Sequence, residues 1–251
     1  MGFHIVIPAR YRSQRLPGKP LLDLAGKPII QHVYERACEA GAQSVTIATD
    51  DQRIADVAQR LGAAYCMTSA DHASGTDRAA EVVALRKWAD DQIVVNVQGD
   101  EPLIPPAIIR QVARLLWEVP GVSMATLCEP MKDVSEAADP NVVKVVFSRD
   151  RRALYFSRAP IPWSLGEETK KTGGQYYRHV GIYAYRAAYL KRFTQLSPAP
   201  LERTERLEQL RALWHGDPIA VAPAEVATPP GVDTPEDLQQ LRHQFGMSGP
   251  F

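Results

Sequence analysis

The sequence predicts an α/β fold, in which a mostly parallel sheet is covered by helices on both faces. Short apolar runs rich in β-branched residues alternate with segments of helical periodicity through the first half of the chain, the pattern of parallel sheets. The chain has 251 residues, 45% hydrophobic and 23% charged, as in an ordinary soluble globular protein. Polar clusters follow three expected strands, at 10–19, 50–51 and 98–101. Because ligands bind at the carboxyl ends of parallel strands, we expect these clusters to form one site.

The first element is a buried strand that leads into a cationic loop. An apolar run from Phe3 to Ile7 predicts the strand, and we expect Pro8 to end it because proline has no N–H to donate to a ladder. Gly18 permits a sharp turn beside Lys19. The loop carries four cationic side chains, those of Arg10, Arg12, Arg15 and Lys19. It suits a polyanion such as a nucleoside triphosphate; a solvated basic loop is the alternative.

This loop matches neither of two common phosphate-binding motifs. Pro20 follows Gly18 and Lys19 where a Walker A loop needs Ser or Thr, and the upstream glycine is missing. No G-x-G-x-x-G follows the first strand, which argues against a dinucleotide fingerprint. Any phosphate binding here must therefore rest on a different arrangement of the backbone and the cations.

The remaining elements of the first half follow from periodicity and turn signals. Apolar residues between 29 and 37 have helical spacing, and Gly41 follows as a stop. Further helices are expected at 51–61, 77–88 and around 108–116, and strands at 44–49, 63–68, 92–97 and 122–127. The segment 69–76 is polar and is expected to be a loop.

The second half changes character. Residues 142–147 and 153–156 predict a strand–turn–strand hairpin, 158–175 a loop, and 178–185 an aromatic-rich strand. One helix is expected over 202–214. A last helix begins with Thr234 as N-cap, Pro235 at its first position and Asp237 placed for a capping box. We expect a single domain, 1–251, with an inserted lobe at about 130–195.

Composition narrows the class of protein. Lys+Arg and Asp+Glu are both 29, and this balance argues against a nucleic-acid binder. The three cysteines, Cys38, Cys66 and Cys128, are scattered, which fits a reducing compartment and gives no metal or disulfide framework. No apolar run approaches membrane-spanning length, and the start of the chain lacks a signal-peptide pattern. We expect a cytoplasmic protein without membrane contact.

Two carboxylates are candidate Mg²⁺ ligands. Asp100 follows an apolar strand and a glycine, and a carboxylate at a strand end facing a cationic loop suits Mg²⁺, which is held by one or two carboxylates plus substrate phosphates. Asp233 is a candidate second ligand, but an acid at a helix start is also favoured by the helix dipole alone.

Three other polar positions also have two interpretations each. The loop before Arg78 could hold an anion with free N–H groups, or Thr76 or Asp77 could simply cap the helix. His179 is a ligand contact or a structural histidine of its strand, and Glu208 is a pocket residue or a solvated acid.

The chain carries no sign of a nucleophile relay. It contains neither G-x-S-x-G nor H-E-x-x-H, and no cysteine sits in a recognisable catalytic setting. Cations, metal carboxylates and a polar pocket remain, and these suit phosphoryl or nucleotidyl transfer, which needs positioning and charge neutralisation.

Nine segments together resemble the CMP-Kdo synthetase family, the 3-deoxy-manno-octulosonate cytidylyltransferases, in that family's order. They are 6–21, 48–51, 72–78, 94–102, 140–144, 156–158, 179–183, 207–211 and 231–237. The resemblance covers nearly the whole chain, and only the loop 164–176 and the tail after Phe245 carry no family signal. It implies a Rossmann-like nucleotidyltransferase fold and a homodimer.

The resemblance also implies the reaction and the residues that perform it. CTP and Kdo would give CMP-Kdo and pyrophosphate, with Mg²⁺, for lipopolysaccharide synthesis. Family roles carried onto this sequence give catalytic Lys19, Asp100 and Asp233, with Asp100 and Asp233 as Mg²⁺ ligands. Nucleotide contacts are implied for Pro8, Ala9, Arg10, Arg15, Lys19, Ser74 and Gly75. Sugar contacts are implied for Arg78, Gln98, His179, Tyr183 and Glu208.

Two alternatives stay open at this point. A related cytidylyltransferase could use another acid sugar, such as a sialic acid or an eight-carbon amino sugar. A non-catalytic nucleotide-binding regulator could share the fold, although a mere sensor need not keep Lys19, Asp100 and Asp233 together.

Overall fold

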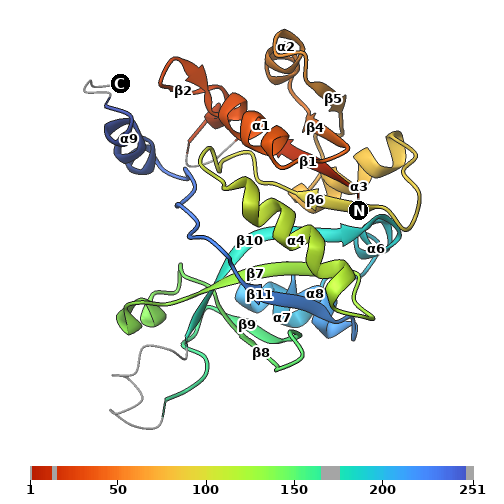
Figure 1. The fold of residues 1–251 in the computed structure, drawn as a ribbon, viewed down its shortest axis with the longest axis vertical. Helices are drawn as coiled ribbons and strands as arrows, with labels where there is room; N and C mark the ends of the chain where they lie inside the picture. Colours follow the sequence, from red (N-terminus) through yellow and green to blue (C-terminus); the bar gives the residue numbers. More distant parts are fainter. Residues whose placement is uncertain (1, 13–15, 165–175, 247–251) are drawn as a thin grey trace.

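A central sheet organises the computed structural model, which describes residues 2–12, 16–164 and 176–246 (Figure 1). Its strands are β1 Phe3–Ala9, β4 Ser44–Thr49, β5 Ala64–Met67, β6 Ile93–Asn96, β7 Met124–Pro130, β8 Lys144–Phe147, β9 Ala153–Ser157, β10 Tyr177–Arg186 and β11 Ile219–Pro223. The main order is β11-β7-β10-β6-β1-β4-β5. A separate small hairpin pairs β2, Asp23–Leu24, with β3, Lys27–Pro28.

The sheet is mostly parallel, as the sequence predicts. Strand β1 pairs in parallel with β4 and β6, β4 with β5, and β11 with β7. Only β10 runs against its neighbours β6 and β7 within this order. The carboxyl ends of β1, β4 and β6 therefore lie at one edge of the sheet, and the segments that follow them meet there.

Helices cover both faces of the sheet. They are α1 Ile29–Glu39, α2 Gln52–Arg60, α3 Gly75–Leu85, α4 Pro106–Glu118, α6 Ala187–Phe193, α7 Pro200–Glu205, α8 Leu210–Trp214 and α9 Pro235–Gln244. One apolar cluster joins the sheet to α1, α2, α4 and α9, and a second joins the opposite face to α3, α6 and α8. The fold class expected from the sequence is confirmed.

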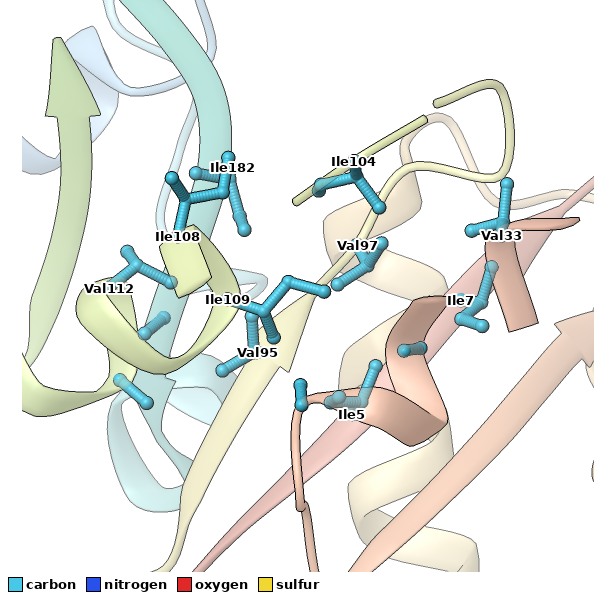
Figure 2. Close-up of a cluster of buried hydrophobic side chains, with 14 of the residues drawn as sticks. Ile5, Ile7, Val33, Val95, Val97, Ile104, Ile108, Ile109, Val112 and Ile182 are labelled. Atoms are coloured by element: carbon cyan, nitrogen blue, oxygen red, sulfur yellow. The ribbon is translucent and has the colours of Figure 1, made fainter. Parts of the chain in front are cut away.

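Strand β1 shows how the sequence builds the two clusters. Successive side chains of a strand point to opposite faces, so Ile5 and Ile7 enter the first cluster and Val6 enters the second. Figure 2 shows Ile5 of β1 and Val95 of β6 directed toward Ile109 of α4. An apolar run buried on both faces is typical of a central parallel strand.

Pro8 does not end the first strand, contrary to the expectation. Strand β1 continues to Ala9, and Pro8 and Ala9 still pair with β4. Pairing of β1 with β6 stops at the Val6–Asn96 pair, so no ladder bond to β6 is needed from the nitrogen of Pro8.

The expected helix over 202–214 is wrong, because the structure breaks it in two. Helix α7 ends at Glu205, Arg206 takes a left-handed conformation with φ 54° and ψ 48°, and α8 begins at Leu210. The spacing of Leu207 and Leu210 suggested a continuous helix, but both side chains are buried although the helix is broken between them and α7. The break leaves Glu208 between the two helices.

The second half holds two further elements that sequence patterns missed, β11 and α6. Strands β8 and β9 form the expected hairpin, which attaches to β10 through one pairing, Arg178 with Lys144. The division into a main domain and an inserted lobe stays a prediction. No helix within the described ranges is both long and apolar enough to cross a membrane.

Candidate active site

A cavity of about 1000 Å³ opens at the carboxyl ends of β1 and β6. Ten of the site residues expected from the sequence line it: Pro8, Ala9, Arg10, Lys19, Ser74, Gly75, Arg78, Gln98, Asp100 and Asp233. The cavity lies where two of the three polar clusters meet. Arg15, another expected nucleotide contact, lies outside the described residues.

The third polar cluster does not line the cavity. Asp51 caps α2 by accepting a hydrogen bond from the N–H of Arg53, and its carboxylate also pairs with that arginine's guanidinium at 2.7 Å. Asp50 lies behind the cavity wall, with its Oδ2 atom 3.5 Å from Arg78 Nη2. The expectation that 50–51 contributes directly to the site is therefore wrong.

Lys19 joins the two candidate metal ligands. Its Nζ lies 2.6 Å from Asp100 Oδ2 and 3.1 Å from Asp233 Oδ1. The lysine side chain is only 12% exposed, whereas Asp100 and Asp233 are 30% and 50% exposed. Both carboxylates thus reach one cationic position at the edge of the cavity.

The turn before Lys19 sets its position. Gly18 has φ 69°, a left-handed conformation that glycine adopts without strain, and its N–H donates to the carbonyl of Tyr11 at 3.0 Å. The Tyr11 ring is itself covered by the guanidinium of Arg53, 3.3 Å from the ring centroid. The turn expected at Gly18 is confirmed.

Asp100 and Asp233 come from distant segments that touch. Asp100 follows β6, and Asp233 immediately precedes Thr234, the N-cap of α9. The N–H of Val232 donates to the carbonyl of Asp100 at 2.8 Å. Thr234 and Asp237 form the expected capping box, so the cap and the candidate ligand are separate residues.

The donor set fits Mg²⁺. Within the described residues, no group of three or more His, Cys, Asp and Glu side chains is placed to hold a metal ion. Two carboxylates that converge on one cationic position are the set that Mg²⁺ uses when substrate phosphates and water supply its other ligands. Hard carboxylate oxygens favour Mg²⁺ over softer metals.

The start of α3 forms another wall of the cavity. Ser74 is the N-cap: its Oγ accepts from the N–H of Asp77 and donates to the Asp77 carboxylate at 3.0 Å. The N-cap is thus Ser74 and neither Thr76 nor Asp77, although Asp77 closes a capping box by accepting from the N–H of Ser74 at 3.1 Å. Gly75 packs on Pro8, since a Cβ at Gly75 would meet the Pro8 ring at 3.3 Å. This contact joins α3 to β1.

Arg78 is buried in the wall with its charge balanced. It is only 3% exposed, donates to Thr68 Oγ1 and faces Asp50. An arginine held this way is rigid, and one edge of it lines the cavity. Its expected role in sugar binding stays a prediction.

The other expected sugar residues form a second group beside the cavity. Thr76 Oγ1 donates to Glu208 Oε2 at 2.6 Å. Burial raises the pKa of Glu208, and hydrogen bonds from Thr76 and Ser74 oppose that rise. Burial and the charge of Glu208 both raise the pKa of Tyr183. Glu208 and Tyr183 therefore belong to one polar group that reaches the cavity through the first turn of α3.

His179 completes this group. Its ring centroid lies 5.0 Å from Phe156 and 5.4 Å from Tyr183, and its Nε2 lies 2.9 Å from Thr126 Oγ1. The Thr126 hydroxyl donates to backbone carbonyls, so Nε2 carries the proton and Nδ1 is the acceptor. Burial lowers the pKa of His179 to about 3, and the imidazole is neutral.

The pKa of His179 predicts a pH dependence of stability. It is about 3 in the folded protein against an ordinary 6.5, so the unfolded chain takes up the proton first as pH falls. The contribution to stability is complete above pH 6.5 and is lost as pH drops toward 3. Between pH 7 and 5 we expect the wild-type unfolding free energy to fall by about 2 kcal/mol more than that of His179→Asn. Urea unfolding of both proteins measures this difference, and equal losses would contradict it.

Sequence reasoning did not single out Thr76 or Glu101 as functional residues. Thr76 appeared only as an alternative cap, yet it holds Glu208. Glu101 belonged to a polar cluster, and burial together with the charge of Asp100 raises its pKa to about 8. The sequence signal that could have identified Glu101 is its position directly after the candidate ligand Asp100.

Comparison with known proteins identifies the family of the chain. The cytidylyltransferase family model matches residues 4–219. A 3-deoxy-manno-octulosonate cytidylyltransferase from Nitrosococcus oceani is 53% identical over 248 residues, covering 96% of both chains. One from Vibrio vulnificus is 56% identical over 245 residues, covering 96% of this chain and 97% of the relative.

Solved structures give the same result. A structure of CMP:2-keto-3-deoxy-manno-octonic acid synthetase complexed with CTP matches with a TM-score of 0.90 and 46% identity, covering 98% of this chain and 99% of that one. A 4-diphosphocytidyl-2C-methyl-D-erythritol synthase from Anaerococcus prevotii matches with a TM-score of 0.63 at 10% identity, covering 98% and 99%, which shows the shared fold alone. The family expected from the sequence motifs is confirmed: the chain belongs to the cytidylyltransferases and, among them, to the 3-deoxy-manno-octulosonate cytidylyltransferase family.

Proposed function

We propose that the protein transfers the cytidylyl group of CTP to the anomeric hydroxyl of Kdo, giving CMP-Kdo and pyrophosphate for lipopolysaccharide synthesis. The observation that carries this proposal is the convergence of Lys19, Asp100 and Asp233 at the cavity, in a chain of this family. In the reaction the hydroxyl oxygen of the sugar bonds to the α-phosphorus. The bond from that phosphorus to the bridging oxygen breaks, pyrophosphate leaves, and the hydroxyl proton is released.

We also propose Mg²⁺ as the cofactor, held by Asp100 and Asp233. Bound there, Mg²⁺ would supply neutralisation of phosphate charge and orientation of the reacting groups. The support is the convergence of both carboxylates on one cationic position and the preference of Mg²⁺ for two carboxylates plus phosphate oxygens.

The cationic loop would hold the triphosphate. Arg10 and Lys19 line the cavity at its edge with Asp100. Lys19 donates through an ammonium group that can approach phosphate oxygens from several directions, and it would stabilise the charge that develops on the leaving pyrophosphate. The cytidine would lie against Pro8, Ala9, Ser74 and Gly75, which form the adjoining wall.

The second polar group would hold the sugar hydroxyls. Kdo is a polyol, and it needs both donors and acceptors from its pocket. Nδ1 of neutral His179 and the carboxylate of Glu208 supply acceptors, while the Tyr183 hydroxyl stays protonated because its pKa is raised. A site that hydrogen-bonds particular hydroxyls discriminates strongly against sugars that lack them. This polar group supports a defined acid sugar as the acceptor.

Pyrophosphate release tests the proposed reaction. We expect release with CTP, Mg²⁺ and Kdo together, and none when UTP or ATP replaces CTP or when sialic acid replaces Kdo. Release with CTP and a different acid sugar would overturn the assignment of Kdo. No release with any pair, in a folded protein that binds CTP, would favour a regulator.

We further propose that the protein acts in the cytoplasm as a homodimer. The family resemblance supports both points. Three cysteines without a disulfide among them are compatible with a reducing compartment. Size-exclusion chromatography with light scattering measures the dimer directly.

A further inference from the structure

A network of six hydrogen bonds joins three segments that are far apart in sequence. Glu129 at the end of β7 accepts from Arg178 Nε at 2.9 Å and Nη2 at 2.5 Å, and from Thr228 N at 2.6 Å and Oγ1 at 2.7 Å. Arg178 of β10 also donates to Thr228 O at 3.1 Å and Oγ1 at 2.9 Å. We call Glu129, Arg178 and Thr228 the clamp.

Through Thr228, the clamp holds the segment that leads to Asp233. Residues 224–233, here named the strap, connect β11 with α9 and cross from one part of the molecule to the other (Figure 1). At its start the N–H of Ala224 donates to the carbonyl of Cys128, and at its end that of Val232 donates to the carbonyl of Asp100. Thr228 lies between these two anchors.

The backbone of the strap is restricted between Thr228 and Asp233, so the position of Thr228 affects that of Asp233. Pro229 and Pro230 follow Thr228, and proline fixes its own φ angle and restricts the residue before it. Gly231 comes next and packs against Asp100, where an added Cβ would meet the Asp100 carbonyl oxygen at 3.3 Å. The path from Thr228 to Asp233 is therefore held by the two prolines at its start and by the contacts of Gly231 and Val232 with Asp100 at its end. Asp233 itself is 50% exposed, its carboxylate pairs with Lys19, and its N–H donates to the Asp237 carboxylate at 2.9 Å. Its position therefore depends on the backbone of the strap and on these polar contacts more than on core packing.

The clamp is also strong enough for this task. The Glu129 side chain is 15% exposed and that of Arg178 is 34% exposed. Charge-assisted hydrogen bonds between a guanidinium and a partly buried carboxylate are about twice as strong as neutral ones.

We propose that Glu129 and Arg178 are positioning residues, which act through Thr228 and the strap to hold Asp233 where it can share a cation with Asp100. This inference rests on the proposed Mg²⁺ site. It assigns a catalytic requirement to three residues that lie outside the cavity lining. Loosening the clamp weakens metal binding and leaves nucleotide binding without metal intact.

Isosteric substitutions remove single polar groups of the clamp without changing the size of the side chains. Thr228→Val removes the hydroxyl that bridges Glu129 and Arg178 but keeps the backbone bonds, and Thr228→Ser restores the hydroxyl. Glu129→Gln tests the carboxylate. Glu225→Gln is the matched control, because Glu225 lies on the same strap and pairs with Arg114 at an exposed position, 49% exposed, away from Asp233.

Mn²⁺ binding to the full-length protein is the main readout, followed by electron paramagnetic resonance. We expect Thr228→Val and Glu129→Gln to weaken Mn²⁺ binding by about tenfold, the size of effect usual for groups that orient metal ligands. The Mg²⁺ concentration for half-maximal turnover should rise in parallel. CTP binding in EDTA should change less than twofold, and Thr228→Ser and Glu225→Gln should match the wild type.

The variant Asp233→Asn distinguishes a failure of the clamp proposal from a failure of the proposed metal site. If Asp233→Asn weakens Mn²⁺ binding but Thr228→Val and Glu129→Gln only lower the melting temperature, the clamp proposal is overturned. A Thr228→Val defect that Thr228→Ser fails to repair also overturns it. If Asp233→Asn itself binds Mn²⁺ normally, the proposed metal site is wrong, whatever the clamp variants do.

Discussion

Asp100→Asn should lower kcat by at least about 10³-fold while the protein stays folded. The amide keeps the size of the side chain but has no charge, so it loses the ion pair with Lys19 at 2.6 Å and the ability to hold a hard cation. Asp100 is 30% exposed, so the change removes no core packing. Pyrophosphate release measures turnover, the melting temperature shows whether the protein is folded, and titration with CTP in EDTA measures nucleotide binding.

A surface acid provides the control for this change. Asp91 is exposed in the turn before β6, and Asp91→Asn should match the wild type in all three measurements. Much of the CTP affinity should survive in Asp100→Asn, because the base and ribose contacts proposed for Pro8, Ala9, Ser74 and Gly75 do not involve Asp100. Normal turnover in Asp100→Asn would show that the metal assignment is wrong.

Lys19→Met should change turnover and metal affinity in opposite directions. The methionine loses the charge that would face the leaving pyrophosphate, and kcat should fall by about 10² to 10³-fold. In the structure, however, Lys19 Nζ lies between carboxylate oxygens of the same two residues that would hold Mg²⁺. Without this competing ammonium group, Asp100 and Asp233 should bind Mn²⁺ several-fold more tightly.

Electron paramagnetic resonance of Mn²⁺ without nucleotide measures the second effect. Lys132, an exposed lysine, gives the matched control Lys132→Met, which should leave both quantities unchanged. Weaker Mn²⁺ binding in Lys19→Met would contradict the competition between lysine and metal. Together the two substitutions have a diagnostic pattern, since Asp100→Asn loses metal affinity and Lys19→Met gains it although both lose turnover.

Local sequence patterns predicted the strands and caps that position these groups. The runs that become β1, β4 and β6 are β-branched or apolar and are bounded by polar turns, so their type and order could be read directly. The Thr234–Asp237 cap was equally clear. Sequence patterns left Asp233 undecided between an acid favoured by the helix dipole and a metal ligand. Its contact with Lys19 beside Asp100 supports the second interpretation, which stays a prediction.

Long-range pairing was beyond these patterns. Nothing local requires β10 to run antiparallel between β6 and β7, which pairs Arg178 with Glu129, or requires Thr228 of the strap to contact both. The apolar spacing continues at helical intervals past Arg206, yet Arg206 takes a left-handed conformation that ends α7. The break leaves Glu208 in contact with Thr76, a residue 132 positions away that local spacing does not reveal.

A crystal structure with CTP and Mn²⁺ would test the central claim most directly, because anomalous scattering locates the metal. We expect Mn²⁺ bound to both Asp100 and Asp233, with Lys19 Nζ moved from between them onto the triphosphate. Mn²⁺ bound elsewhere, or Lys19 still between the two carboxylates with CTP in the cavity, would contradict the account.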